Sequence, residues 1–158
     1  MISSYLSVLE DSLRKKIVIL DKIQNANMKQ SELLKVEKLD MEAYDKYVDE
    51  KDDYIAELEK LDEGFESLYS KIREELISNK ALYADQIRVI QSLISEITEK
   101  SVSIQAAESR NREAVTAYFN REKKALGQGR KSSKAAYGYY KNLNQAIREG
   151  SSYMDMKK

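Results

Sequence analysis

The 158-residue sequence contains no cysteine, no histidine, no proline and no tryptophan. Without cysteine the chain can form no disulfide and do no thiolate chemistry, and without histidine it lacks the commonest acid–base group and zinc ligand. Proline and glycine are the residues that most often interrupt helices, and only five glycines are present. These absences weigh against a metal- or nucleophile-dependent enzyme and favour long, uninterrupted helices.

Long apolar runs are also missing. The longest, residues 17–20, has four residues, whereas a membrane-spanning helix needs roughly 20. A signal peptide likewise needs a longer apolar stretch and a small-residue cleavage site, and neither is found. We therefore expect no membrane insertion, and the length predicts a single domain.

Charge is balanced overall but unevenly distributed. The chain has 27 basic and 27 acidic residues, yet residues 40–66 hold 12 acidic and 3 basic residues, and residues 121–158 hold 10 basic and 3 acidic. A basic tail can indicate nucleic-acid binding. Here its charges are spread thinly and the rest of the chain would repel phosphates, so we expect no nucleic-acid partner. The two segments should instead attract each other weakly, in a way that salt screens.

Apolar residues recur at steps of three and four, which is the period of a helix face and not of a strand. The pattern predicts three helices, at about residues 3–34, 41–77 and 81–125, with short links that make neighbours antiparallel. The expected fold is all-α, an antiparallel bundle of three long helices that resembles a coiled coil. Tyrosines on the apolar face are expected in its core: Tyr44, Tyr69, Tyr83 and Tyr118.

Polar residues stand at several positions of the predicted apolar stripe. Asn or Ser at such positions usually fixes the register of a coiled coil and costs some stability. They are Lys16, Asn27 and Gln30 in the first helix, Lys51 and Asp62 in the second, and Ser101, Glu108, Asn111 and Glu122 in the third.

Helix ends are indicated by short polar residues. Ser3 or Ser4 is expected to cap the first helix, and Asp40 the second, because their side-chain oxygens can accept bonds from free backbone N–H groups. A turn is expected around residues 78–80. Gly64 lies inside the second helix, where glycine costs roughly 1 kcal/mol, and the sequence leaves open whether the helix bends or breaks there.

The last part of the chain, residues 127–158, differs in composition from the predicted bundle of residues 1–126. Residues 127–134 read as a flexible basic linker, and the apolar spacing beyond it predicts a short amphipathic C-terminal helix or tail. Tyrosine supplies a large contact area at low entropic cost. We therefore predict a partner-binding face, with docking of the same face on the bundle as an open alternative. This face comprises Tyr137, Tyr139, Tyr140, Leu143 and Ile147.

Catalytic motifs are not found. Gly127 and Gly129 followed by Lys131 and Ser132 lack the spacing of a phosphate-binding loop. Adjacent carboxylates such as Glu74 and Glu75 point about 100° apart on a helix, so they do not converge on one metal ion. We expect no enzymatic activity, no metal site and no cofactor.

Several stretches of the sequence resemble the FlgN-type flagellar export chaperones. They are the leucines at 6, 9 and 13, the segment from Asp40 to Tyr44 that leads to Glu50-Lys51, the stretch of residues 58–61, the polar stretch of residues 97–111, and the ending of residues 151–158. The resemblance covers most of the chain.

The resemblance implies a cytoplasmic chaperone of type III flagellar export. Such a protein holds the C-terminal region of hook–filament junction (hook-associated) proteins, prevents their premature assembly and delivers them to the export gate. By the same resemblance the client would be held by the C-terminal tail. The alternative is a coiled-coil scaffold or adaptor that forms a homodimer and has no flagellar role, and a weak homo-oligomer is compatible with either.

Overall fold

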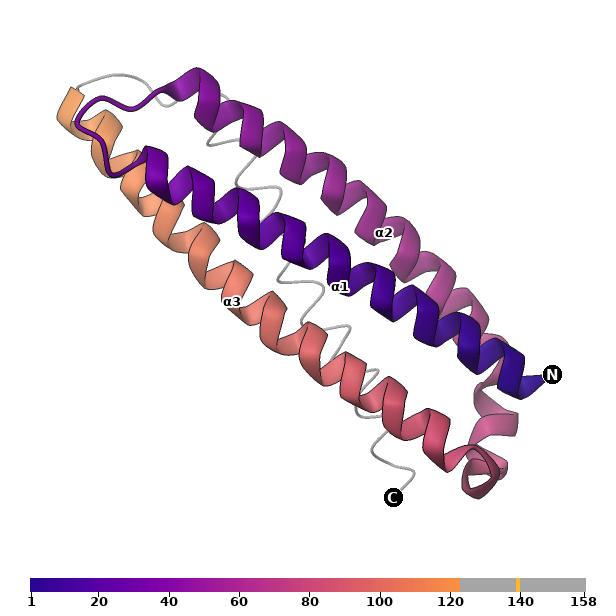
Figure 1. The fold of residues 1–158 in the computed structure, drawn as a ribbon. Helices are drawn as coiled ribbons and strands as arrows, with labels where there is room; N and C mark the ends of the chain where they lie inside the picture. Colours follow the sequence, from indigo (N-terminus) through magenta and orange to yellow (C-terminus); the bar gives the residue numbers. More distant parts are fainter. Residues whose placement is uncertain (123–138, 140–158) are drawn as a thin grey trace.

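The computed structural model describes residues 1–122 and Tyr139, and its described part is an all-α bundle (Figure 1). Three long helices follow one another: α1 from Ile2 to Leu33, α2 from Met41 to Ser78, and α3 from Ala84 to Glu122. A short 3-10 helix, η1, spans Lys80–Tyr83 between α2 and α3. The predicted all-α antiparallel bundle of three long helices is therefore confirmed. The predicted linker and C-terminal helix or tail of residues 127–158 lie outside the described residues, apart from Tyr139.

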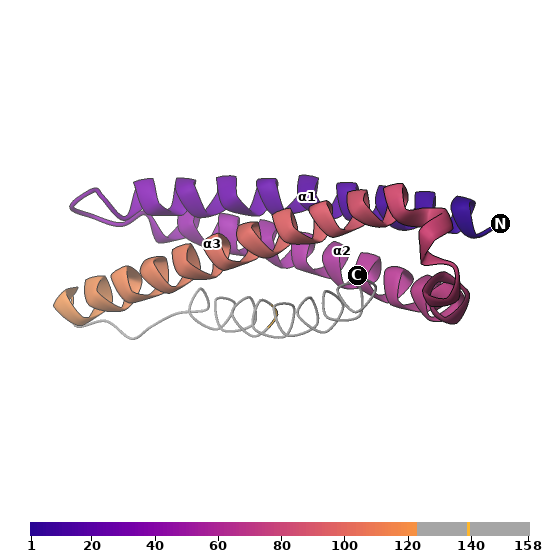
Figure 2. The same ribbon diagram turned by 90° about the horizontal axis from the view of Figure 1, so that it is seen from below.

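Helix α1 is the central element of the bundle. It packs along its length against both α2 and α3, whereas α2 and α3 lie farther from each other than either lies from α1. Figure 1 shows α1 between its two neighbours, with α2 running in the opposite direction to α1 and α3. The view from below in Figure 2 shows the same slender, elongated shape. The bundle therefore consists of two helix–helix seams that share one helix.

The helix starts differ in how well the sequence predicts them. Asp40 caps α2 as expected, because its Oδ1 accepts a bond of 3.1 Å from the backbone N–H of Ala43. The expected Ser3 or Ser4 cap is wrong, because α1 begins after Met1 with no side-chain cap. The carbonyl of Ser3 instead accepts a bond of 3.1 Å from Gln86 Nε2 of α3.

Two further boundary questions are settled by the backbone. The sequence predicts a third helix from residue 81, but the chain first forms η1 and becomes α-helical only at Ala84. Helix α2 runs through Gly64 without a break, and a Cβ at that position would meet no atom within 4 Å. Gly64 therefore lies where packing does not require a glycine.

The interior of the bundle contains two apolar clusters. The longer cluster contains residues of all three helices, with Ile2 of α1 and Ile104 of α3 among them. The shorter cluster lies at the end of the bundle where the α1–α2 connection meets the last turns of α3. Tyr44 and Tyr118 are buried in the shorter cluster and Tyr69 in the longer, as predicted, whereas Tyr83 is only half-buried. Among residues 1–122 and 139, no helix combines the length and apolar character of a membrane span.

Candidate functional site

A closed polar layer separates the two apolar clusters. Lys51 of α2 donates from Nζ to Glu108 Oε1 of α3 at 2.7 Å and to Asn27 Oδ1 of α1 at 2.9 Å. The side chains of Lys51 and Glu108 are only 2% and 3% exposed. One lysine therefore joins all three helices at a single level of the bundle, and we call this set of contacts the closed layer.

Two amides extend the closed layer along the bundle. Asn111 Nδ2 donates to the backbone carbonyl of Asn27 at 3.0 Å, and Gln30 Nε2 donates to the carbonyl of Tyr44 at 3.2 Å. These bonds tie α3 to α1 and α1 to α2. Because the acceptors are backbone atoms, a slip of one helix by a turn would break them, so the layer fixes the register of all three helices.

Burial dominates the electrostatics of the closed layer. Removal from water lowers the pKa of Lys51, and the carboxylate of Glu108 opposes that shift. Burial also raises the pKa of Tyr44, with the charge of Glu108 adding to the effect. The ammonium and carboxylate are within hydrogen-bonding distance and shielded from solvent, which suits structural pairing and not proton transfer to a substrate.

A second polar layer lies nearer the middle of the bundle. Lys16 of α1 pairs with Asp62 Oδ1 of α2, and the other carboxylate oxygen, Oδ2, accepts a bond of 3.0 Å from the hydroxyl of Tyr139. The Lys16 side chain is 7% exposed and that of Asp62 is 35% exposed. Burial lowers the pKa of Lys16, and Asp62 opposes the shift. Because Asp62 remains accessible from outside the three helices, we call this set of contacts the open layer.

Tyr139 is the predicted binding residue that the structure places. It is half-buried, packs against the longer apolar cluster and donates to Asp62. Tyr137, Tyr140, Leu143 and Ile147 lie outside the described residues, so their predicted role stays a prediction. The contact places Tyr139 against the bundle, and the choice between partner binding and docking of the whole face stays a prediction.

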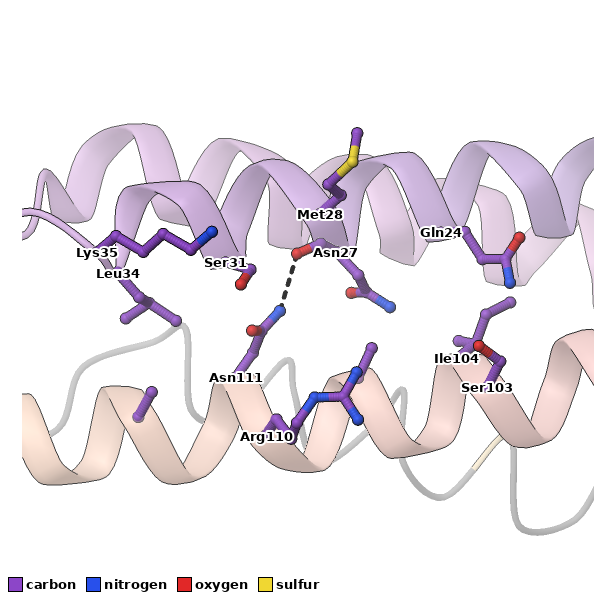
Figure 3. A pocket seen from close by; sticks show the side chains of 12 residues that line it. Gln24, Asn27, Met28, Ser31, Leu34, Lys35, Ser103, Ile104, Arg110 and Asn111 are labelled. Atoms are coloured by element: carbon purple, nitrogen blue, oxygen red, sulfur yellow. Dashed lines mark hydrogen bonds between the residues drawn. The ribbon is translucent and has the colours of Figure 1, made fainter.

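A groove of about 540 Å³ runs between α1 and α3 beside the closed layer (Figure 3). It exists because α3 presents small side chains there, among them Ser103, Ala107 and Ala114. Figure 3 shows Asn111, one of the lining residues, reaching from α3 to α1 in the bond to the backbone carbonyl of Asn27. The lining includes Lys35 and Arg110 but no carboxylate, so it is not a cation site. Within the described residues, no three acidic side chains gather as a metal-binding group.

Sequence reasoning missed the roles of Lys16, Lys51 and Asp62, although it registered each of them as an interruption of an apolar stripe. An interruption on one helix faces an interruption on another: Lys16 meets Asp62, and Lys51 meets Glu108. The signal was therefore present in the sequence. Which interruptions would pair could not be read from it, because the pairing depends on the relative register of helices far apart in the chain.

Comparison with family models, with curated proteins and with solved structures finds no match for this chain.

Proposed function

We propose that this protein is a cytoplasmic, non-enzymatic chaperone of type III flagellar export. Its clients are the C-terminal segments of hook–filament junction proteins, which it keeps unassembled and delivers to the export gate. The proposal begins from the resemblance of the sequence to FlgN-type chaperones.

The observation that carries the proposal is the contact of Tyr139 with the bundle. A tyrosine from outside the three helices is half-buried against the longer apolar cluster and bonded to Asp62. It belongs to a segment whose apolar residues are spaced as on one face of a helix. A segment with this apolar spacing, one tyrosine of which packs against a helical bundle, has the chemistry needed to pair with an amphipathic helix of a client.

The physics of such a client suits this mode of binding. An assembly segment that is amphipathic and disordered on its own cannot bury its apolar face until it meets a partner. Pairing with a second amphipathic helix covers that face and blocks premature assembly. Tyrosines are suited to this task because they give large contact areas and lose few rotamers when they are ordered.

Calorimetry of the full-length chain with the C-terminal segment of a hook–filament junction protein tests the proposal. We expect binding, and we expect Tyr140→Ala with Leu143→Ala to weaken it by about tenfold or more, because both residues lie on the predicted apolar face. The matched control, Lys131→Ala with Lys134→Ala, should mainly change the salt dependence, because exposed charges chiefly steer association. A stable homodimer that shows no heat with the segment would favour the scaffold alternative instead.

A further inference from the structure

Asp62 has an unusual position for a carboxylate. It occupies a core-facing position of α2 and pairs on one side with the nearly buried Lys16. The pair holds the carboxylate in one orientation, with Oδ2 left to accept the hydroxyl of Tyr139 at 3.0 Å. The acceptor is therefore already ordered by the bundle before an incoming donor arrives, which lowers the entropic cost of docking.

The surroundings of Asp62 favour an occupant that is both aromatic and basic. Tyr139 packs against the longer apolar cluster, so the surface beside Asp62 contacts the aromatic ring as well as binding the hydroxyl. Asp62 also lies in residues 40–66, which hold 12 acidic and 3 basic residues, whereas residues 121–158 hold 10 basic and 3 acidic. The charges of this α2 surface and of the segment that carries Tyr139 are complementary.

The longer apolar cluster makes a contact with a residue from outside the three helices. Its buried members come from α1, α2 and α3. Tyr139 is the described residue from outside the three helices that packs against that cluster.

We propose that the surface around Asp62 is a docking site for the chain's own tail, residues 135–147, and that docking there restrains client binding. The second half of this proposal rests on the proposed function, since it assumes that the client pairs with the same tyrosine-rich face. Docking and client binding then compete. Only molecules with an undocked tail can bind the client. The smaller their fraction, the higher the apparent dissociation constant of the client.

The first test needs no client, so its failure is distinguishable from failure of the proposed function. The chain has no tryptophan, so Tyr139→Trp introduces a single tryptophan, which can be excited selectively over the tyrosines and whose indole N–H can still donate to Asp62. In the full-length protein we expect blue-shifted emission that acrylamide quenches poorly. Emission typical of free tryptophan would overturn the proposal.

The test is sharpened by reversing the charge of the docking site. Lys16→Met with Asp62→Lys removes the acceptor and repels the basic tail, while the new lysine can reach solvent at this partly exposed position. We expect this pair of changes to shift the emission of the introduced tryptophan to the red. Glu63→Gln is the matched control, because it makes the same net change in charge at an exposed neighbouring residue. Equal emission from Tyr139→Trp alone, with Lys16→Met and Asp62→Lys, and with Glu63→Gln would show that Asp62 does not hold the tail.

The competition is tested with the client segment and the natural Tyr139. Lys16→Met with Asp62→Lys should bind the segment about 3- to 10-fold more tightly than the unmodified chain, because the tail is no longer docked. Unfolding by urea should first establish that the variant remains folded. Weaker binding by the folded variant would contradict the competition, since it would mean that the client itself uses the Asp62 surface.

Discussion

The closed and open layers are both built on a buried lysine paired with a carboxylate, but they differ in how exposed that carboxylate is. Each contains a buried lysine that is neutralised by a carboxylate from another helix. In the closed layer the carboxylate of Glu108 is 3% exposed, and the remaining partners are amides of the same bundle. In the open layer Asp62 is 35% exposed and takes its further partner from Tyr139. A buried ion pair surrounded by helices thus has all its partners inside the bundle, whereas one with an exposed side leaves its carboxylate within reach of a further donor.

The energetic reasons for the two layers differ accordingly. A fully buried ion pair is weak evidence for stability, because the cost of removing two charges from water offsets their attraction. Its value lies in excluding other registers, since any slip would leave a charge buried without a partner. The partly exposed Asp62 keeps part of its hydration, so its charge costs less free energy to hold than that of the buried Glu108.

The largest effect is expected from breaking the closed layer on one side. Lys51→Met leaves the Glu108 carboxylate buried without a cation and should lower the free energy of unfolding by about 3–5 kcal/mol. Urea unfolding followed by circular dichroism measures the change. The double variant Lys51→Met with Glu108→Leu should recover most of that loss, because no unpaired charge remains. A double variant as unstable as the single one would show that the pair itself is strongly stabilising.

A smaller effect is expected from the same change in the open layer. Lys16→Met leaves Asp62 without its ammonium partner, but that carboxylate can turn toward water, so the loss should be about 1–2 kcal/mol. The comparison of the two single variants under identical unfolding conditions sharpens the distinction between the layers. Equal losses in Lys16→Met and Lys51→Met would contradict it, because burial of the remaining carboxylate would then not matter.

The smallest effect is expected in the pH dependence of the closed layer. Burial raises the pKa of Tyr44, so the folded protein keeps its proton while the unfolded chain ionises near the ordinary value of 10.0. Stability from this group is present below about pH 10 and is lost as the pH rises toward the folded-state pKa. The lowered pKa of Lys51 acts in the opposite direction, favouring the folded state as the pH rises toward 10.5.

Replacement of Tyr44 isolates its share of the alkaline response. Tyr44→Phe should lose less stability between about pH 9 and pH 11 than the unmodified chain, because the hydroxyl that resists ionisation is gone. Urea midpoints at the two pH values give the comparison. A steeper alkaline loss in Tyr44→Phe would mean that the sign assigned to this group is wrong.

Much of the fold followed from local patterns. The steps of three and four that join Leu6, Leu9 and Leu13 predict a helix because they describe one helical face, and Asp40 marks a start because its oxygen is within reach of a free N–H. The predicted Ser3 or Ser4 cap was wrong, because a serine near a helix start can cap the helix but the helix can also begin before it. Here α1 begins at Ile2, so Ser3 and Ser4 lie inside its first turn and not at the capping position.

The candidate site was less predictable, for a physical reason. Lys16 and Asp62 are 46 residues apart, and Lys51 and Glu108 are 57 residues apart. Their pairing depends on how three helices slide against one another, which is set by the whole interface and not by any short segment. A sequence pattern can identify a polar residue on an apolar stripe, but it does not indicate whether its partner will be enclosed or accessible.

The most direct test of the account compares client binding in two double variants by calorimetry. One, Lys51→Met with Glu108→Leu, removes the ion pair of the closed layer, and the other, Lys16→Met with Asp62→Lys, removes the docking group of the open layer. We predict an affinity within about twofold of that of the unmodified chain for the first variant, and about 3- to 10-fold tighter binding for the second. A change confined to the closed-layer variant, or the absence of binding by any form, would contradict it.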